Sequence, residues 1–112
     1  MVDLSDLRYN AKHGDFFFAK FQIRDYIRKS PVFVLSNQCD KNDDVVICLC
    51  TSQPAKSEFD IKVQLKKETY VRTNKIHTIS RSQLLFRIDH QFGPGEYEEL
   101  INKLKKALDL KA

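Results

Sequence analysis

The sequence predicts a mostly β domain of the α+β class, in which short strands form a compact barrel and one amphipathic helix ends the chain. Short runs rich in aromatic and β-branched residues follow one another along most of the sequence. Clusters of Gly, Pro, Asn, Asp and Ser separate these runs, as is typical of turns. The last segment instead carries apolar residues at helical spacing. With 112 residues and no internal repeats, the chain suits a single domain.

A short N-terminal extension is expected over residues 1–13, where Leu4 and Leu7 share one side of a helical turn or two. At Gly14 the pattern changes to an apolar, strand-like run. We therefore place the domain itself over residues 14–112.

The first three strands are expected at Phe16–Phe21, Pro31–Leu35 and Val45–Cys50. Proline cannot donate a hydrogen bond to a neighbouring strand, so Pro31 is expected at the first position of its strand. The preceding segment, Gln22–Ser30, is then a short loop. The polar residues Asn42–Asp44 favour a turn, which predicts that the second and third strands form a hairpin.

The remaining strands are expected in the second half of the chain. Residues Ile61–Lys66 alternate between apolar and polar, as in a strand with one face in water. The segment Thr69–Ile79 has the same character. A polar turn at Ser80–Gln83 then leads into a last strand at Leu84–Ile88, and the glycines around Pro94 end the β portion.

The final element is predicted to be an amphipathic helix over Glu96–Leu108. Glutamates occupy its first turn and lysines its later turns, which complements the helix dipole. Its apolar residues recur at helical spacing: Tyr97, Leu100, Ile101, Leu104 and Leu108. This helix is expected to pack on the sheet or on a partner.

Composition limits the classes of function. The net charge of +4 favours polyanionic partners such as RNA or DNA, through attraction to phosphate. No apolar stretch approaches the roughly 20 residues that a membrane span requires, and the sequence starts without an export pattern. We therefore expect a cytoplasmic protein with no membrane partner.

The three cysteines are expected to be reduced, because a cytoplasmic compartment disfavours disulfides. They are Cys39, Cys48 and Cys50. Without a nearby histidine they form a poor zinc ligand set, so small buried side chains are the preferred interpretation. Neither a metal ion nor another cofactor is expected.

Several short motifs occur in a fixed order along the chain. They are Gly14-Asp15 before an apolar strand, Ser30–Asn37, Leu49–Gln53, Thr78–Leu84 and the helix Glu96–Leu108. In this order and spacing, from about Gly14 to Leu110, the sequence resembles the PemK/MazF family of toxin ribonucleases. The resemblance implies an SH3-like β-barrel and a homodimer with a groove for single-stranded RNA. It also implies metal-independent, sequence-selective cleavage that leaves a cyclic phosphate and a 5′-hydroxyl, and a cognate antitoxin that binds the same groove.

The resemblance makes Arg28 and Thr51 the candidate catalytic residues. Cutting RNA by attack of the 2′-hydroxyl requires stabilisation of the negative charge that grows on the phosphate, and the family uses Arg and Thr for much of this. Thr51 stands where the family motif has its threonine. The family arginine directly precedes the proline, where this chain has Ser30, so Arg28 is the nearest arginine that could replace it.

Further residues are candidates for RNA binding or proton transfer. Six polar or basic side chains are expected to contact RNA: Arg24, Lys29, Ser52, Gln53, Lys75 and Arg81. The general base is left open between His77, a carboxylate such as Asp25, and water. The phenylalanines of the first strand are interpreted as core rather than as a base-stacking surface: Phe16, Phe17, Phe18 and Phe21.

Two other functions stay open beside the endoribonuclease. A non-catalytic relative could bind RNA or an antitoxin after losing cleavage, because Ser30 replaces the family arginine. A toxin of related fold could instead bind a protein target, as gyrase-poisoning toxins do, with the terminal helix as its contact surface. Cleavage of RNA distinguishes the endoribonuclease from both alternatives.

Overall fold

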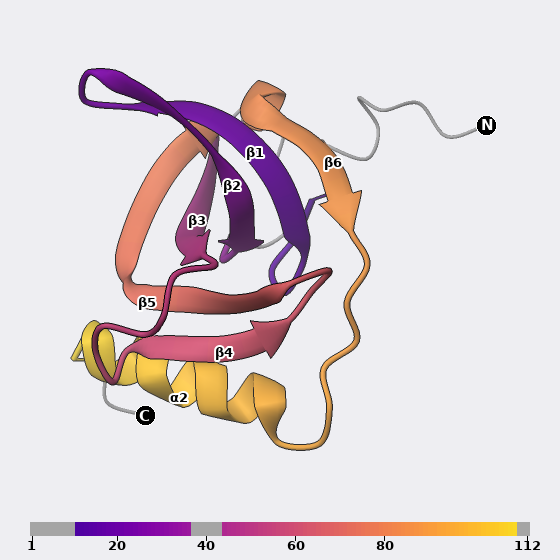
Figure 1. Cartoon of the computed structure of the whole chain (residues 1–112), viewed down its shortest axis with the longest axis vertical. Helices are drawn as coiled ribbons and strands as arrows, with labels where there is room; N and C mark the ends of the chain where they lie inside the picture. Colours follow the sequence, from indigo (N-terminus) through magenta and orange to yellow (C-terminus); the bar gives the residue numbers. More distant parts are fainter. Residues whose placement is uncertain (1–10, 37–43, 110–112) are drawn as a thin grey trace.

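The computed structural model describes residues 11–36 and 44–109. Within these residues the chain forms six strands, a short 3₁₀ turn and one helix, as Figure 1 shows. They are β1 (Phe16–Ile23), β2 (Tyr26–Val34), β3 (Asp44–Thr51), β4 (Asp60–Gln64), β5 (Glu68–Ser80), η1 (Arg81–Gln83), β6 (Leu84–Ile88) and α2 (Glu96–Ala107). The prediction of a mostly β fold with a C-terminal helix is confirmed. The predictions for Leu4, Leu7, Cys39, Asn42 and Asp43 lie outside the described residues.

The strands form one antiparallel sheet in the order β4-β5-β3-β2-β1-β6. The sheet curls strongly, and α2 lies beneath β4 and β5 (Figure 1). Among the described residues no ladder joins β4 to β6, so these two edge strands border an open seam in the barrel. The predicted hairpin partners β2 and β3 do pair.

The segment that the sequence predicts as a loop, Gln22–Ser30, is instead a hairpin. β1 and β2 pair up to Ile23 and Tyr26, and only Arg24 and Asp25 form the turn. Arg24 has φ 54°, the left-handed conformation that such tight turns require. The loop prediction is wrong because the turn lacks the Gly or Asn that usually marks it.

The position of Pro31 also differs from its prediction, because it lies inside β2 rather than at its first residue. The Val34 N–H donates to the Asp15 carbonyl at 2.8 Å, toward the β1 side. Alternation along the strand then turns the Pro31 nitrogen toward the β3 side. Pairing with β3 covers only Val32–Val34, so Pro31 costs the sheet no hydrogen bond.

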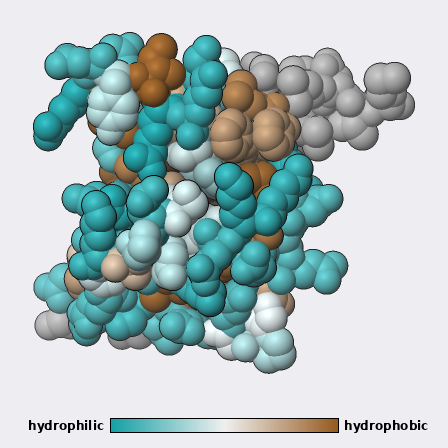
Figure 2. All heavy atoms as spheres, in the orientation of Figure 1, coloured by the Kyte–Doolittle hydropathy of each residue, from teal (hydrophilic) through white to brown (hydrophobic). Residues whose placement is uncertain are grey.

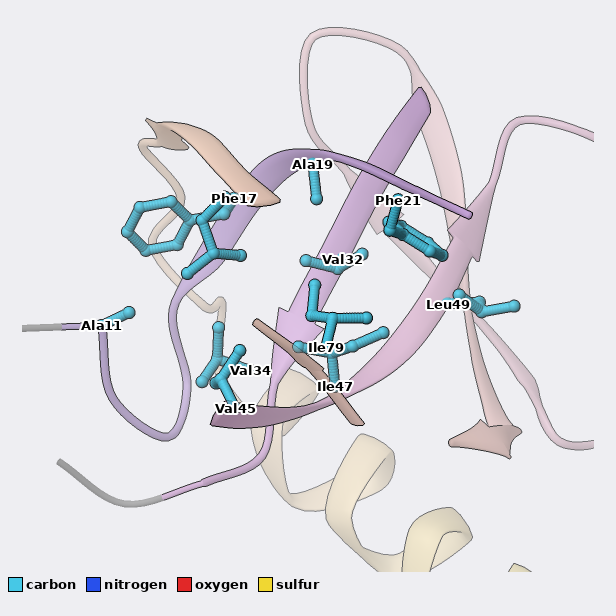
Figure 3. Close-up of a cluster of buried hydrophobic side chains, with 11 residues drawn as sticks. Ala11, Phe17, Ala19, Phe21, Val32, Val34, Val45, Ile47, Leu49 and Ile79 are labelled. Carbon is cyan, nitrogen blue, oxygen red and sulfur yellow. The ribbon is translucent and has the colours of Figure 1, made fainter. Parts of the chain in front are cut away.

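Two apolar cores lie on opposite faces of the sheet. The inner core, shown in Figure 3, contains Phe17, Val32 and Ile47, and Ala11 also belongs to it. The helix-side core contains Phe16, Phe33, Cys48, Leu100 and Leu104 among others. Because side chains of a strand alternate between faces, neighbouring phenylalanines of β1 enter different cores. Sheet and helix are thereby joined into one unit.

The two described cysteines are buried, as predicted, and neither forms a disulfide among the described residues. Burial raises the pKa of Cys48 to about 12 and also raises the pKa of Cys50 well above its usual value. Both thiols therefore stay protonated and act as small apolar side chains of the helix-side core.

Residues just before Gly14 pack with the domain. Ala11 is fully buried, and its carbonyl accepts a hydrogen bond from Arg81 Nη1 at 2.9 Å. His13 bonds the Leu35 carbonyl at 2.9 Å through Nδ1 and the Tyr97 hydroxyl through Nε2. The packed part of the chain thus begins earlier than the expected boundary. In the described residues no helix has the length and apolarity that a membrane crossing needs.

Candidate functional site

Two cavities meet beside the middle of β2 and the end of β3. The larger has a volume of about 720 Å³, and the smaller about 160 Å³. Arg28 and Thr51 are the two residues that line both. The larger cavity is also lined by Phe18, Lys29, Ser30, Pro31, Cys50, Ser52, Leu65, Lys66, Lys67, Thr69, Phe86, Arg87, Ile88 and Asp89. The smaller is completed by Gln53, Pro54, Lys56, Asp60 and Arg72.

The larger cavity follows the open seam of the sheet. One side of its lining comes from β6 and the residue after it, and another from the turn between β4 and β5. Figure 1 shows β6 and the β4–β5 turn on the same side of the molecule. On the face drawn in Figure 2, most residues are hydrophilic, and hydrophobic residues reach the surface only in separate patches. The cavity thus extends from the seam to Arg28 and Thr51.

Arg28 is half-buried and held by two hydrogen bonds. Its Nε donates to Ser30 Oγ at 3.1 Å, and its Nη2 donates to the Cys50 carbonyl at 2.9 Å. The first bond is possible because residues two apart on a strand share a face. The second ties β2 to the end of β3, next to Thr51. The guanidinium is thus fixed beside the threonine by the fold itself.

Thr51 ends β3, just after an irregularity in the pairing of β3 with β5 between Cys48 and Cys50. Such irregularities bend a strand and redirect its side chains. The Thr51 hydroxyl accepts a hydrogen bond from the Gln53 N–H at 3.1 Å. An accepting hydroxyl can still donate its own hydrogen. Thr51 is therefore oriented and able to donate toward a bound group.

The lining of the larger cavity is strongly basic. Five of its residues carry a positive charge and one a negative charge: Arg28, Lys29, Lys66, Lys67 and Arg87 against Asp89. Arg87 forms an ion pair with Asp15 at 3.4 Å, but more than half of its side chain stays exposed. In the smaller cavity, Arg72 pairs with the buried carboxylate of Asp60 at 3.4 Å. The excess positive charge of the larger cavity suits a phosphate-bearing ligand.

A family model decides the classification. The model of the PemK-like, MazF-like toxins of type II toxin-antitoxin systems matches residues 12–108. The chain belongs to this family. The matched span covers every described strand and the helix. Among curated proteins, none matches the chain.

Solved structures of PemK/MazF-like toxins share the fold. An endoribonuclease from a mycobacterial species aligns with a TM-score of 0.73 and 17% identity, over 92% of this chain and 95% of that one. The Mycobacterium tuberculosis toxin MazF-mt6 aligns with a TM-score of 0.73 and 16% identity, over 88% and 99%. A MazE-MazF structure from Deinococcus radiodurans gives 0.70 and 18%, over 92% and 100%. At these identities the likeness establishes the fold alone.

The structure of this PemK/MazF-like chain brings five of the predicted site residues together. Arg28, Lys29, Thr51 and Ser52 line the larger cavity, and Gln53 lines the smaller one. The two candidate catalytic residues therefore lie among three of the candidate RNA contacts. Ser30, the departure from the family pattern, is 8% exposed and hydrogen-bonds Arg28.

Other predicted residues lie apart from both cavities. Arg24 is exposed in the β1–β2 turn, and Lys75 is exposed on β5. Arg81 is only 2% exposed and donates to the Ala11 carbonyl. Its guanidinium therefore connects η1 to the segment before β1, and Arg81 lines neither cavity. His77 and Asp25 line neither cavity. Their assignment to RNA binding or proton transfer gains no support from this arrangement.

The sequence does not point to several residues of the seam. Lys66 and Lys67 form the β4–β5 turn, and a pair of lysines in a turn is an ordinary surface feature. Phe86 and Arg87 reach the cavity only because β6 pairs with β1. The sequence predicts Phe18 as a core residue, yet it is half-buried and lines the cavity. Nothing local in the sequence distinguishes it from its buried neighbours.

Within residues 11–36 and 44–109, no three His, Cys, Asp or Glu side chains gather in a way that could hold a metal ion. That the reaction needs no metal ion stays a prediction, and RNA cleavage in the presence of a chelator tests it directly.

Proposed function

We propose that this chain is an endoribonuclease toxin of a type II toxin–antitoxin system, and that it cuts single-stranded RNA at the junction of the two cavities. One observation carries the proposal. Arg28 and Thr51, the two candidate catalytic residues, are the two residues that line both cavities. A phosphate at their junction can meet both side chains at once.

The proposed reaction is an internal transfer at phosphorus. The substrate 2′-oxygen loses a proton and forms a bond to phosphorus, and the bond from phosphorus to the 5′-oxygen breaks. The products are a 2′,3′-cyclic phosphate and a 5′-hydroxyl, which takes up a proton. Arg28 stabilises the negative charge that develops on the phosphate, and Thr51 donates a hydrogen bond to a phosphate oxygen. The proton acceptor is not assigned to a residue.

The contacts of Arg28 favour catalysis over a purely binding relative. The guanidinium has five N–H donors, and its bonds to Ser30 and the Cys50 carbonyl use two, which leaves three for a phosphate. Arg28 and Ser30 share a face of β2, so an arginine two positions before the family site can serve the same side of the strand. Ser30 thereby supports the replacement arginine.

RNA binding is assigned to the basic and polar lining around this junction. Lys29 adds positive charge from β2, and Lys66 and Lys67 line the same cavity from the β4–β5 turn. These lysines would follow the phosphate backbone. Ser52 and Gln53 carry hydroxyl and amide groups that would contact base edges beside the scissile bond, which provides sequence selectivity.

We infer that the chain works in the cytoplasm as a homodimer controlled by a cognate antitoxin. One similar structure is of an endoribonuclease in complex with its cognate antitoxin, and others are MazE-MazF structures. The basic cavity offers an acidic antitoxin segment the same charges that it offers RNA. Co-purification with the product of a neighbouring small open reading frame would test this partnership.

The decisive experiment is an RNA digest in the presence of EDTA. The purified chain should cut a long RNA into discrete fragments that end in a cyclic phosphate and begin with a 5′-hydroxyl. Arg28→Ala should lower cleavage by at least about a hundredfold, which is the usual effect of losing one donor to a transition-state oxyanion. Arg24→Ala is the matched control, because that arginine lines neither cavity.

Two outcomes would contradict the proposal. Intact RNA at high protein concentration, with RNA binding retained, would support the non-catalytic relative. Equal cleavage by Arg28→Ala and the unsubstituted protein would remove Arg28 from the mechanism. Growth arrest without RNA decay would instead favour a protein target.

A further inference from the structure

Phe18 and Phe86 form a stacked aromatic pair at the seam. Their ring centroids lie 5.2 Å apart and the rings are inclined by only 11°. Phe18 is half-buried, and Phe86 is 47% exposed. The other β1 phenylalanines, Phe16, Phe17 and Phe21, are at most 2% exposed. This pair is therefore not part of either closed core.

The pair belongs to an apolar row that crosses three strands. Phe18 pairs with Phe86 of β6 on one side and with Pro31 of β2 on the other. All three side chains line the larger cavity. Cross-strand partners have Cβ atoms about 5 Å apart, so the row forms a short continuous surface. It leads from the edge strand toward the segment of β2 that carries Arg28.

Exposure and position together set Phe86 apart. Four large apolar side chains are strongly exposed in the described residues: Tyr26, Ile27, Phe86 and Leu108. Of these, Phe86 alone lines a cavity. Its ring is also stacked on the ring of Phe18, which fixes its orientation. A rigid aromatic face beside a cavity is a surface for a planar ligand.

The charge around the pair indicates what that ligand is. Arg87 follows Phe86 on β6, and Lys29, Lys66 and Lys67 line the same cavity. Proteins that bind single-stranded nucleic acid combine such a positive groove with aromatic side chains on which bases stack. The central parts of protein–protein interfaces are instead depleted of lysine. A nucleobase fits these surroundings better than an apolar protein segment.

We propose that Phe86, supported by Phe18, is a stacking platform for one nucleobase of the RNA whose phosphate lies at Arg28 and Thr51. This inference rests on the proposed function and adds a binding residue to it. Every base has an aromatic face, so the platform contributes affinity and position with little choice of sequence. Selectivity for the RNA sequence would come from hydrogen-bonding groups such as Gln53.

The test is a thermodynamic cycle on short single-stranded RNA. Dissociation constants are measured in an Arg28→Ala background, in which cleavage is slow, for a series of oligonucleotides that each carry one abasic position. Phe86→Ala should weaken binding of intact RNA about tenfold or more. One abasic position should weaken binding to the Phe86 protein by a similar factor, yet hardly affect Phe86→Ala. That coupling identifies the stacked base.

Three further variants complete the design. Phe86→Tyr keeps the ring face and should bind within about twofold of the Phe86 protein. Phe86→Leu keeps apolar bulk without a π face, so it should bind RNA about tenfold or more weakly than the Phe86 protein. It takes the place of Phe86→Ala if the alanine variant folds poorly. Tyr26→Ala is the matched control, because Tyr26 is 54% exposed and lines neither cavity. It should leave binding unchanged.

The outcomes separate this inference from the proposed function. Cleavage by the unsubstituted chain, together with full RNA affinity of Phe86→Ala, overturns the platform and leaves the nuclease. A loss of affinity that couples to no abasic position also overturns it. Coupled binding without cleavage supports the platform and refutes the nuclease. A chain that neither binds nor cuts RNA overturns both.

Discussion

The two walls of the larger cavity are built differently. The held wall consists of Arg28 and Ser30, which lie within β2, and of Thr51, which ends β3. Its side chains are at least half-buried, and hydrogen bonds to one another or to the backbone fix them. The seam wall consists of Lys66, Lys67, Phe86 and Arg87. These residues are exposed and lie on an edge strand or in a turn. One cavity thus combines a side held by hydrogen bonds with a side of exposed residues.

The difference corresponds to two different tasks. Stabilising a transition state requires donors held to within a fraction of an ångström, and a fixed arginine loses less side-chain entropy when it meets a phosphate. Holding a flexible RNA strand tolerates movement, because phosphate attraction and base stacking depend weakly on exact geometry. We therefore expect substitutions in the held wall to change kcat and those in the seam wall to change KM.

The largest effect is expected for Thr51→Ala. Loss of the hydroxyl donor should lower kcat by about 100- to 1000-fold with little change in KM, because the lost bond strengthens only as charge develops. Thr51→Ser keeps the hydroxyl and should stay within about tenfold of the unsubstituted protein. Kinetics on a short RNA substrate, with circular dichroism to check the fold, measure this. An unchanged kcat for the alanine variant would remove Thr51 from the held wall.

A smaller effect is expected for Ser30→Ala, which removes one of the two hydrogen bonds on Arg28. The remaining bond to the Cys50 carbonyl keeps the guanidinium near its place. Losing one hydrogen bond to a charged group corresponds to a decrease in kcat of about tenfold or more. Steady-state kinetics should show that decrease without a matching rise in KM.

Ser30→Arg then distinguishes the held wall from the family pattern. Ser30 is 8% exposed and pairs with the fully buried Ala19. A second arginine there would bring a like charge beside Arg28 into a site built for serine, so cleavage should decrease. An increase in cleavage would show that Arg28 does not replace the family arginine. It would favour the non-catalytic hypothesis for the natural sequence.

The seam wall is tested by the double variant Lys66→Gln and Lys67→Gln. If each lysine contacts one phosphate, the plot of log affinity against log salt concentration should become less steep by about 1.4. Each phosphate contact on a single strand contributes about 0.7 to the magnitude of this slope. The value of kcat should stay unchanged. Lys75→Gln with Lys105→Gln removes the same charge from exposed positions outside both cavities. If this control lowers the slope equally, net charge rather than the seam binds RNA.

The held wall could be predicted from the sequence only in part. Thr51 follows from a local motif at the end of an obvious apolar strand. Arg28 was a candidate, but its contact with Ser30 depends on both residues lying on one strand, and the sequence predicted a loop there. The first half of β2 is largely polar and exposed, so it lacks the apolar alternation that identifies strands. Pairing with β1 provides the strand conformation instead.

The seam wall could not be predicted, because it depends on which strands end at the edges. Lys66 and Phe86 are about twenty residues apart in sequence and share a cavity only through the order of strands in the sheet. Phe18 has the same local sequence environment as the core residues Phe16 and Phe17. Phe16 and Phe17 pair with β6 as well, so neither the local sequence nor the partner strand marks Phe18 as a cavity residue. Such features are properties of topology rather than of local pattern.

The smallest effect is expected at Arg24, which lies outside both walls. Its left-handed backbone, φ 54°, costs an L-residue about 1 kcal/mol or more, and glycine avoids that cost at the price of greater freedom in the unfolded chain. Arg24→Gly should therefore raise the melting temperature by a few degrees, about what a gain below 1 kcal/mol produces. Calorimetry measures this, and cleavage should stay unchanged.

Arg24→Ala separates the backbone effect from the charge effect at the same position. It removes the guanidinium but keeps a Cβ in the left-handed conformation, so stability should stay near that of the natural sequence. A decrease in cleavage in both variants would mean that the hairpin tip binds RNA through Arg24. The division into a held wall and a seam wall would then be incomplete, because a third element would approach the substrate from the β1–β2 turn.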